Sequence, residues 1–147
     1  AMLAATAAHT LQQAVTTSDA AHAAHLDDEQ TNTATWGFGK IGRLGHNSLK
    51  NLSTPAPVAA FAGHYAVQVV CGGQFTLVLE NDGRVYAFGN AEAGLCGVGA
   101  VTGQAVMAPT PVALPAKAAT AVRAFAGYYS GAVVTADGAA YAWGKGE

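Results

Sequence analysis

The sequence predicts an all-β fold of about two and a half to three blades of a β-propeller, each blade a four-stranded antiparallel sheet. Three observations lead to this fold class. Short phrases recur at intervals of 52 to 55 residues, short apolar runs end at glycine-containing turns, and 18 of the 147 residues are glycine without a collagen-like period. Repeats of about this length that hold several short strands are typical of propeller blades.

Three phrases mark the repeat and keep a common register. The first is an aromatic residue followed by glycine, the second is Gly-x-x-Gly, and the third is Pro-x-Pro-Val. They occur at Trp36-Gly37, Phe88-Gly89 and Trp143-Gly144, at residues 42–45 and 94–97, and at residues 55–58 and 109–112. Three independent phrases with nearly the same spacing are hard to produce by chance, so the repeat is real.

Within each repeat, the residue pattern predicts short strands joined by tight turns. Strands are expected at the apolar runs 67–71, 75–79, 121–126, 132–135 and 139–143, and at residues 84–88, which alternate polar and apolar side chains. Asp82-Gly83 and Asp137-Gly138 separate neighbouring runs, and Asp-Gly supplies the positive φ that a tight hairpin needs. The Pro-x-Pro-Val step is expected to start a further strand after its prolines, because proline suits an edge strand or the first residue of a strand.

Residues 1–30 permit two interpretations. They are rich in alanine and glutamine and contain neither glycine nor proline, a composition that favours helix. The repeat register instead favours strand, long loop, strand, since residues 5–11 align with residues 71–77 and residues 14–17 continue a second strand. On that interpretation, which we prefer, an insertion loop covers about residues 20–33.

The repeat divides the chain into three parts. Residues 1–35 end one blade and contain the insertion, residues 36–89 form a second repeat unit, and residues 90–147 form a third, truncated unit. An open set of blades leaves strand edges and apolar faces unpaired. We therefore expect the ordered portion of a longer protein, held inside a large assembly.

The composition limits the partners and the compartment. The net charge is −2, and the densest basic group is only Lys40, Arg43 and Lys50. Nucleic acids and anionic membranes are bound through Lys/Arg clusters, so neither partner is expected, and no apolar run is long enough to span a bilayer. Cys71 and Cys96 lack metal or redox spacing. As free thiols they suit an intracellular, reducing compartment such as the cytoplasm or a cytoskeletal or organellar assembly.

The repeated phrases resemble the repeats of the regulator of chromosome condensation family. The family pattern runs Gly-x-x-His, Asp-Gly, Tyr-x-(Trp/Phe)-Gly, Gly-x-x-Gly and a proline-led strand. The middle unit supplies it with residues 72–77, Asp82-Gly83, residues 86–89 and residues 94–97, and the other units match parts of it. The resemblance implies a partial seven-bladed propeller.

The chain also departs from the family pattern. Phe75 and Ser130 stand where the pattern has histidine, and only His9 keeps it. The resemblance permits guanine nucleotide exchange on a Ras-like GTPase through one propeller face, but the contact residues of such members have no counterpart that we can place. The plant ultraviolet-sensing members use clustered tryptophans, whereas this chain has only Trp36 and Trp143. Both belong to the aromatic-Gly step, so a photoreceptor is disfavoured.

No catalytic residue, cofactor site or metal site is predicted. Residues 37–42 match Gly-x-Gly-x-x-Gly literally, but a dinucleotide site also needs a following helix and a distant acidic residue. The repeat explains these glycines as turn residues. His22 and His25 lie beside Asp27 and Asp28, and we expect a solvent-exposed loop there rather than a metal site. No nucleophile elbow or pair of catalytic carboxylates is found.

Tyr128 and Tyr129 are the candidates for partner contact. They occupy a loop between two predicted strands. Such loops lie on a propeller face, where exposed aromatic side chains can anchor a protein partner. Ordinary packing between blades is the alternative interpretation.

These observations favour a non-catalytic protein–protein interaction scaffold rather than an enzyme. Its partners are expected to be other proteins, such as the subunits of a large complex, with no nucleic acid and no membrane. Two alternatives stay open. One is guanine nucleotide exchange on a Ras-like GTPase, and the other is a regulatory propeller attached to an enzyme such as a ubiquitin ligase.

Overall fold

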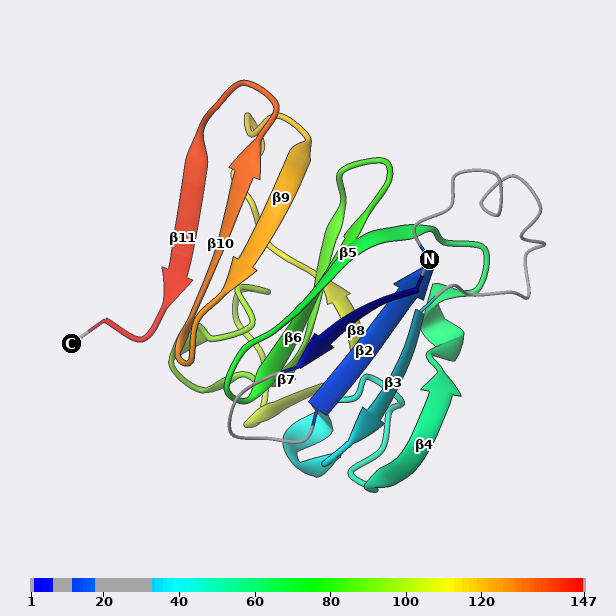
Figure 1. The fold of residues 1–147 in the computed structure, drawn as a ribbon. Helices are drawn as coiled ribbons and strands as arrows, with labels where there is room; N and C mark the ends of the chain where they lie inside the picture. The colour runs from blue at the N-terminus through cyan, green and yellow to red at the C-terminus, as the bar shows by residue number, and fades with distance from the viewer. Residues whose placement is uncertain (1, 7–11, 18–32, 147) are drawn as a thin grey trace.

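Three antiparallel sheets stand side by side in the structure (Figure 1). The computed structural model describes residues 2–6, 12–17 and 33–146, and it describes side chains from residue 33 onward. Two of the sheets have four strands and the third has three. In each sheet consecutive strands are neighbours, which is how a propeller blade is built. The all-β propeller prediction is therefore confirmed, and we refer to the sheets as the first, second and third blade.

The strands follow one another in chain order. The first blade contains β1 (Met2–Thr6), β2 (Gln12–Thr17), β3 (Thr33–Gly37) and β4 (Leu52–Pro57). The second contains β5 (Ala66–Cys71), β6 (Phe75–Glu80), β7 (Val85–Asn90) and β8 (Ala105–Pro111). The third contains β9 (Ala121–Ala126), β10 (Ser130–Thr135) and β11 (Ala140–Gly144). Three short 3-10 turns, η1 (Lys40–Gly42), η2 (Ala59–Phe61) and η3 (Glu92–Gly94), lie between them. Each apolar run predicted from residue 66 onward coincides with a strand to within one or two residues.

The N-terminal part is built from strands where it is described. β1 pairs with β2, and β2 pairs with β3, so strand is the correct choice over helix for residues 2–6 and 12–17. The predicted insertion loop, with His22, His25, Asp27 and Asp28, lies outside the described residues.

The pairing register corrects one detail of the sequence alignment. Phe75 lies opposite Gly89 in the second blade, and Gln12 lies opposite Gly37 in the first. Gln12 is therefore the residue equivalent to Phe75, whereas the alignment assigned that place to His9. His9 itself lies outside the described residues. The offset arose because this segment has no glycine to mark the turn between the two strands.

The position of the proline-led strands was also predicted wrongly. β4 and β8 end at the second proline of each Pro-x-Pro-Val step rather than beginning after it. Both strands are the last of their sheets, and a strand at a sheet edge tolerates proline because one side of it needs no N–H donor. The valine that follows is folded back onto the sheet: Val58 N donates to Thr33 O and Val112 N donates to Val85 O, at 3.0 and 2.8 Å.

The hydrophobic core lies between the blades. All six residues of β6 are buried, because the second blade has a neighbour on each side. The ring of Phe75 and the side chains of Leu77 and Leu79 belong to one cluster that also contains Ala124 and Val133 of the third blade. None of the described elements covers the far side of the third blade.

The repeated aromatic-Gly and Gly-x-x-Gly phrases hold neighbouring blades together. The ring of Phe88, in the second blade, lies 3.0 Å from the point that a Cβ on Gly45 of the first blade would occupy. Trp143 Nε1, in the third blade, lies 2.5 Å from the same point on Gly97 of the second. A side chain at either glycine would overlap the ring. The second glycine of each phrase is therefore required by the aromatic residue of the next blade.

One main-chain carbonyl in each Gly-x-x-Gly turn also accepts a hydrogen bond from the next blade. Thr76 Oγ1 donates to Arg43 O at 3.1 Å, and Trp143 Nε1 donates to Leu95 O at 3.0 Å. Arg43 and Leu95 hold the same place in their turns. The same acceptor is thus satisfied by a hydroxyl at one interface and by an indole at the other.

The two donors, Thr76 and Trp143, each belong to a pair of residues that lie opposite each other on neighbouring strands, and the composition of the pair differs between the two blades. Thr76 lies opposite Phe88, whose ring has no N–H, so the threonine supplies the donor. Gly131 lies opposite Trp143, and a Cβ at Gly131 would lie 2.7 Å from the indole. The larger indole therefore takes both the space of the threonine side chain and its hydrogen bond.

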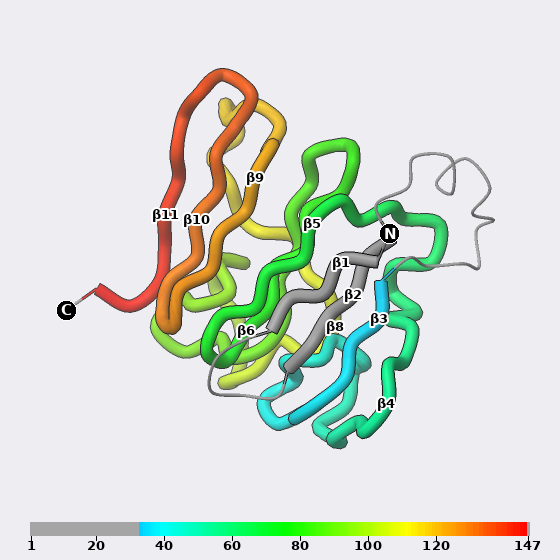
Figure 2. Tube along the Cα trace, in the orientation of Figure 1, coloured from blue at the N-terminus to red at the C-terminus, as the bar shows by residue number. Residues whose placement is uncertain are grey.

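The connections between strands gather at two ends of the blades (Figure 2). We call one end the loop face. It consists of the loops that follow β3, β5, β7 and β9 and of the segment after β11: residues 38–51, 72–74, 91–104, 127–129 and 145–146. We call the opposite end the hairpin face. It consists of the connections that follow β4, β6, β8 and β10: residues 58–65, 81–84, 112–120 and 136–139. The aromatic-Gly step ends the third strand of each sheet on the loop face.

Candidate functional site

Tyr128 and Tyr129 lie on the loop face, in the turn between β9 and β10. Their side chains are 48% and 47% exposed. The two rings pack edge to face, with centroids 4.5 Å apart and planes at 74°. Packing between blades therefore leaves about half of each side chain open to solvent. Contact with a partner remains a prediction for both residues.

The turn that carries the two tyrosines is fixed to the second blade. Gly127 N donates to Ser130 O at 2.7 Å and closes the turn, and Gly73 N donates to Tyr128 O at 3.3 Å. A Cβ at Gly73 would lie 2.9 Å from the ring of Tyr128. The ring therefore rests on the backbone of the β5–β6 turn, which the glycine leaves uncovered.

Lys145 extends the aromatic pair on one side. Its ammonium lies 5.6 Å from the ring centroid of Tyr129, which is within the range of a cation–π contact. Lys145 N donates to Tyr129 O at 3.0 Å. This main-chain bond places the lysine beside the ring.

Arg43 of the first blade extends the pair on the other side. Burial lowers the pKa of its guanidinium, and the nearby phenol of Tyr128 raises it. The guanidinium carbon lies 5.3 Å from the ring centroid of Phe38, and Arg43 Nε donates to Lys40 O at 2.9 Å. Arg43 O also accepts from Thr76 Oγ1, so the loop that carries Arg43 and the turn that carries Tyr128 are both held by the second blade, at Thr76 and Gly73.

We call this set of residues on the loop face the aromatic-basic strip. It consists of Phe38, Lys40, Arg43, Tyr128, Tyr129 and Lys145. The sequence showed the two tyrosines and the basic group as separate features. Nothing in the spacing of the residues indicated that the second blade holds both the loop after β3 and the turn after β9.

The loop face is positively charged in the part of the chain that the structure describes. It carries Lys40, Arg43, Lys50 and Lys145, and Glu92 is its one acidic residue among those described. Lys40, Lys50 and Lys145 are exposed, whereas Arg43 is only 2% exposed. The three lysines are therefore available to a ligand. Arg43 is buried, so it contributes only its positive charge to the electrostatic potential of the face.

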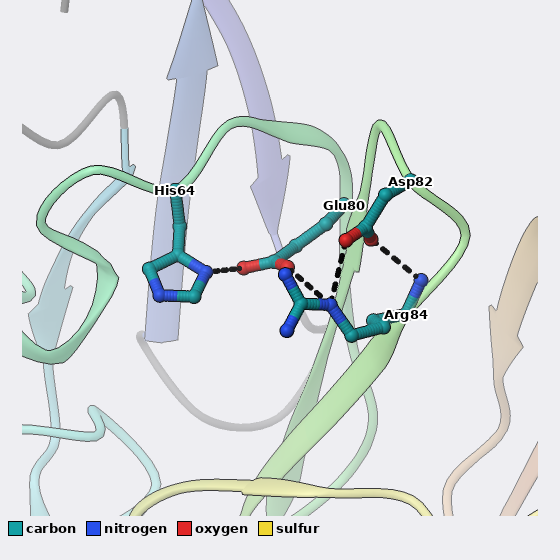
Figure 3. Close-up of polar contacts among 4 residues, drawn as sticks. All are labelled: His64, Glu80, Asp82 and Arg84. Carbon is teal, nitrogen blue, oxygen red and sulfur yellow. Dashed lines mark hydrogen bonds and ion pairs between the residues drawn. The ribbon is translucent and has the colours of Figure 1, made fainter.

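A second polar cluster lies on the hairpin face (Figure 3). His64 Nδ1 lies 2.6 Å from Glu80 Oε1, and Arg84 Nε lies 3.5 Å from Glu80 Oε2. Arg84 Nε also lies 2.6 Å from Asp82 Oδ2, and Arg84 N donates to Asp82 Oδ1 at 3.0 Å. The contact between His64 and Glu80 thus has the distance of an ion pair.

The two carboxylates of this cluster differ in their titration. Glu80 is only 2% exposed, and burial raises its pKa, with partial opposition from His64 and Arg84. Burial alone would raise the pKa of Asp82 too, but the hydrogen bonds and charge of Arg84 hold it below the usual value. Both carboxylates are already engaged by neighbouring cations. The cluster ties the connection between the first two blades to the β6–β7 hairpin, and we assign it a structural role.

The described residues offer little else for chemistry. No three or more His, Cys, Asp or Glu side chains among them gather as a metal site. No helix in the described part of the chain is long and apolar enough to cross a membrane. Cys71 and Cys96 are free, and burial raises their pKa values to about 11 and about 12. Residues 37–42 form the end of β3 and the turn η1, not the start of an α-helix.

Meandering sheets that are joined through repeated aromatic and glycine positions define a repeat protein of the β-propeller class. Two family models, both described as the regulator of chromosome condensation (RCC1) repeat, match residues 35–79 and residues 66–94. The chain belongs to this RCC1-like repeat family.

Curated relatives match most of the chain. It is 31% identical over 134 residues to the ultraviolet-B receptor UVR8 of Arabidopsis thaliana, with 88% of this chain and 29% of the receptor covered. It is 34% identical over 116 residues to the human E3 ubiquitin-protein ligase HERC2, with 77% of this chain and 2% of the ligase covered. The chain thus spans less than a third of each of these relatives.

Solved propeller structures match in fold. Prp20p from Saccharomyces cerevisiae, a structure described together with its binding properties to Gsp1p and histones, has a TM-score of 0.69 at 26% identity. The match covers 96% of this chain and 32% of Prp20p. Human WBSCR16 has a TM-score of 0.69 at 24% identity, with 92% of this chain and 32% of that one covered.

Proposed function

We propose that the chain is part of a non-catalytic scaffold that binds partner proteins through the loop face of its propeller. The observation that carries this proposal is the exposed pair of Tyr128 and Tyr129, held in place by backbone hydrogen bonds. Tyrosine supplies a large contact area, and a pair already fixed in the free protein loses little conformational freedom on binding.

Two features of the described residues support a role without catalysis. The thiols of Cys71 and Cys96 have raised pKa values and so are poor nucleophiles at neutral pH. Asp82 and Asp137 accept hydrogen bonds from the backbone of their own hairpins, as turn residues do. The same free cysteines support placing the protein in a reducing compartment, which localisation of the tagged full-length protein would test.

The test compares full-length protein with a variant that carries Tyr128→Ala and Tyr129→Ala. We expect the double variant to lose a defined set of proteins that co-purify with the unsubstituted protein. Leu49→Ala is the matched control, because Leu49 is also exposed on the loop face but lies outside the aromatic-basic strip. An unchanged set of co-purifying proteins, with equal thermal stability of the variants, would contradict the proposal.

Guanine nucleotide exchange is the second candidate function. It is supported by membership of this repeat family and by the similarity to Prp20p, which is described with its binding to Gsp1p. The assay is release of a fluorescent GDP analogue from a panel of Ras-like GTPases in the presence of the full-length protein. Accelerated release from one GTPase would favour exchange over a scaffold.

A regulatory propeller attached to an enzyme is the third candidate. It is supported by the 34% identity to the ligase HERC2, a protein of which the chain covers only 2%. The sequence of the complete protein and a ubiquitin-transfer assay with it would distinguish this candidate from a free-standing scaffold.

A further inference from the structure

We propose that the aromatic-basic strip recognises an acidic peptide segment that carries an apolar or aromatic side chain among its Asp and Glu residues. This inference rests on the proposed scaffold function and names the chemistry of its partner. Three features support it: the arrangement of the strip across the blades, the charge of the loop face and the number of exposed cations on it.

The strip is one surface assembled by all three blades. Tyr128 of the third blade rests on Gly73 of the second, and Thr76, three residues further along the second blade, donates to Arg43 O of the first at 3.1 Å. Tyr129 and Lys145 continue it in one direction, and Phe38 continues it in the other. Because the surface crosses from blade to blade, it suits an extended ligand that spans several loops rather than a compact one that fills a single pocket.

The charge of the loop face selects a partner of opposite sign. The described part of the face holds four basic residues, Lys40, Arg43, Lys50 and Lys145, against the single acidic residue Glu92. The chain as a whole has a net charge of −2, so this local excess of positive charge is not the average of the molecule. A negatively charged segment is therefore attracted to this face in particular.

The aromatic side chains of the strip indicate which kind of residue accompanies the acidic residues in the bound peptide. Phe38, Tyr128 and Tyr129 are all exposed and offer aromatic surface on which an apolar side chain can pack. The ammonium of Lys145 stands over the ring of Tyr129, so a carboxylate that pairs with it lies next to that surface. An acidic residue followed by an apolar one matches this arrangement.

A peptide fits the strip better than a nucleic acid does. Binding to a phosphate backbone is carried by many Lys and Arg contacts, whereas Lys40, Lys50 and Lys145 are the exposed cations of the described loop face. Arg43 is buried and cannot grip a phosphate directly. Single-stranded RNA is nevertheless one arm of the test, because aromatic side chains also stack on bases.

The experiment measures binding of short fluorescein-labelled probes to the full-length protein by anisotropy. The probes are an Asp/Glu-rich peptide with one phenylalanine, the same peptide with lysine in place of each acid, the acidic peptide with serine in place of phenylalanine, and an oligouridine. We expect the first probe to bind, and the second and third to bind at least about tenfold more weakly. Binding should weaken as salt is raised.

Charge reversal on the two faces supplies a matched pair of variants. Lys145→Glu should weaken the acidic-aromatic peptide by about tenfold or more, and Lys40→Glu should act in the same direction. Lys117→Glu makes the same charge change on the hairpin face, at a residue that is also exposed, and should leave binding unchanged. Equal effects of Lys145→Glu and Lys117→Glu, or tighter binding of oligouridine than of any peptide, would overturn the inference.

The outcomes separate this inference from the scaffold proposal. If no acidic peptide binds but Tyr128→Ala with Tyr129→Ala still removes co-purifying proteins, the scaffold stands and the acidic-peptide chemistry is wrong. If the tyrosine variant keeps every co-purifying protein and no peptide binds, both proposals fail.

Discussion

The indole of Trp143 fills the space that a side chain on Gly97 would need, since Trp143 Nε1 lies 2.5 Å from an ideal Cβ at that glycine. Trp143 belongs to the third blade and Gly97 to the second. The Gly-x-x-Gly phrase of one blade therefore packs against the aromatic-Gly phrase of the following blade. The number of residues between these two phrases is the length of chain that leads from one blade to the next.

Gly97→Ala should destabilise the protein more than Gly94→Ala does. Both glycines have positive φ, of 66° and 72°, but a Cβ at Gly94 would meet nothing within 4 Å. Gly94→Ala should cost about 1 kcal/mol from backbone strain, and Gly97→Ala about 3 kcal/mol because overlap with Trp143 is added. Urea unfolding of the full-length variants measures both. Equal losses would mean that the indole does not constrain Gly97.

Removing the hydroxyl of Thr76 should destabilise the interface between the first two blades. Thr76→Val keeps the shape of the side chain but leaves Arg43 O without this donor, and a buried carbonyl that loses its donor costs about 2 kcal/mol. Thermal unfolding checks the loss. Thr110→Val is the control, because its hydroxyl donates to Ala108 O within its own strand and no blade contact depends on it.

The two donor pairs should be exchangeable as pairs but not singly. Gly131→Thr alone should strongly destabilise the third blade, because its new Cβ would lie 2.7 Å from Trp143. Gly131→Thr combined with Trp143→Phe recreates the pair that Thr76 and Phe88 form in the second blade. We expect the double variant to be more stable than the sum of the single effects by about 2 kcal/mol. Additive effects in a double-mutant cycle would contradict the equivalence of the pairs.

The pH dependence of stability should change in opposite directions in Glu80→Gln and Asp137→Asn. The pKa of Glu80 is raised, mainly by burial, so the folded state holds its proton more tightly than the unfolded state does. Its contribution to the free energy of unfolding is therefore present below the usual Glu pKa of about 4.3 and is lost as pH rises through the raised value. The advantage of the unsubstituted protein over Glu80→Gln should shrink across that window.

Asp137 should change the pH dependence of the unfolding free energy in the direction opposite to Glu80. A hydrogen bond from Thr135 is the main reason that its pKa is lowered, so its contribution is present above the usual Asp pKa and is lost as pH falls through the lowered value. The advantage over Asp137→Asn should therefore grow with rising pH. Denaturant titrations at a series of pH values test both variants, and parallel curves for the two would refute the assignments.

Cys71 and Cys96 should resist thiol reagents while the protein is folded. Their pKa values of about 11 and about 12 leave very little thiolate at neutral pH. Mass-spectrometric mapping after iodoacetamide treatment should find Cys71, which is only half-buried, modified before the buried Cys96, and both fully modified in denaturant. Rapid labelling of Cys96 in the folded protein would show that its environment is more open than the structure indicates.

Residues 1–147 expressed alone should self-associate through the far side of the third blade. Phe125 is 49% exposed there, and its cross-strand neighbour Ala132 in turn faces Ala142, which makes an apolar sheet face without a cover. Phe125→Lys should reduce the association. Size-exclusion chromatography with light scattering measures it, and a monodisperse monomer of the unsubstituted segment would contradict the prediction.

Local chemistry explains which parts of the fold the sequence could predict. The hairpins at Asp82 and Asp137 were predictable because the turn depends on neighbouring residues alone, and Asp82 Oδ1 does accept from Arg84 N. The strand containing Pro111 was placed on the wrong side of the proline, because only the assembled sheet shows that β8 is an edge strand. The alignment of His9 failed for lack of a local turn marker.

The candidate site was predictable only in part for a related reason. The repeat register placed Tyr128 and Tyr129 in a loop, since a repeat fixes where each loop falls. Their position relative to Arg43 depends on how the first and third blades pack against the second, and no pattern in the sequence carries that information. The pairing of Glu80 with His64 was not predicted either, because His64 comes from a different connection.

The hydrogen bond between blades bears on how such a protein can evolve. The acceptor is a main-chain carbonyl, which every blade offers whatever its side chains, and the donor with its supporting neighbour lies wholly within the following blade. As long as the preceding blade keeps the second glycine of its Gly-x-x-Gly turn, a blade can therefore be duplicated, deleted or exchanged by recombination without a further compensating change there. This independence allows the loops on each copy to diverge while the junctions between copies stay intact.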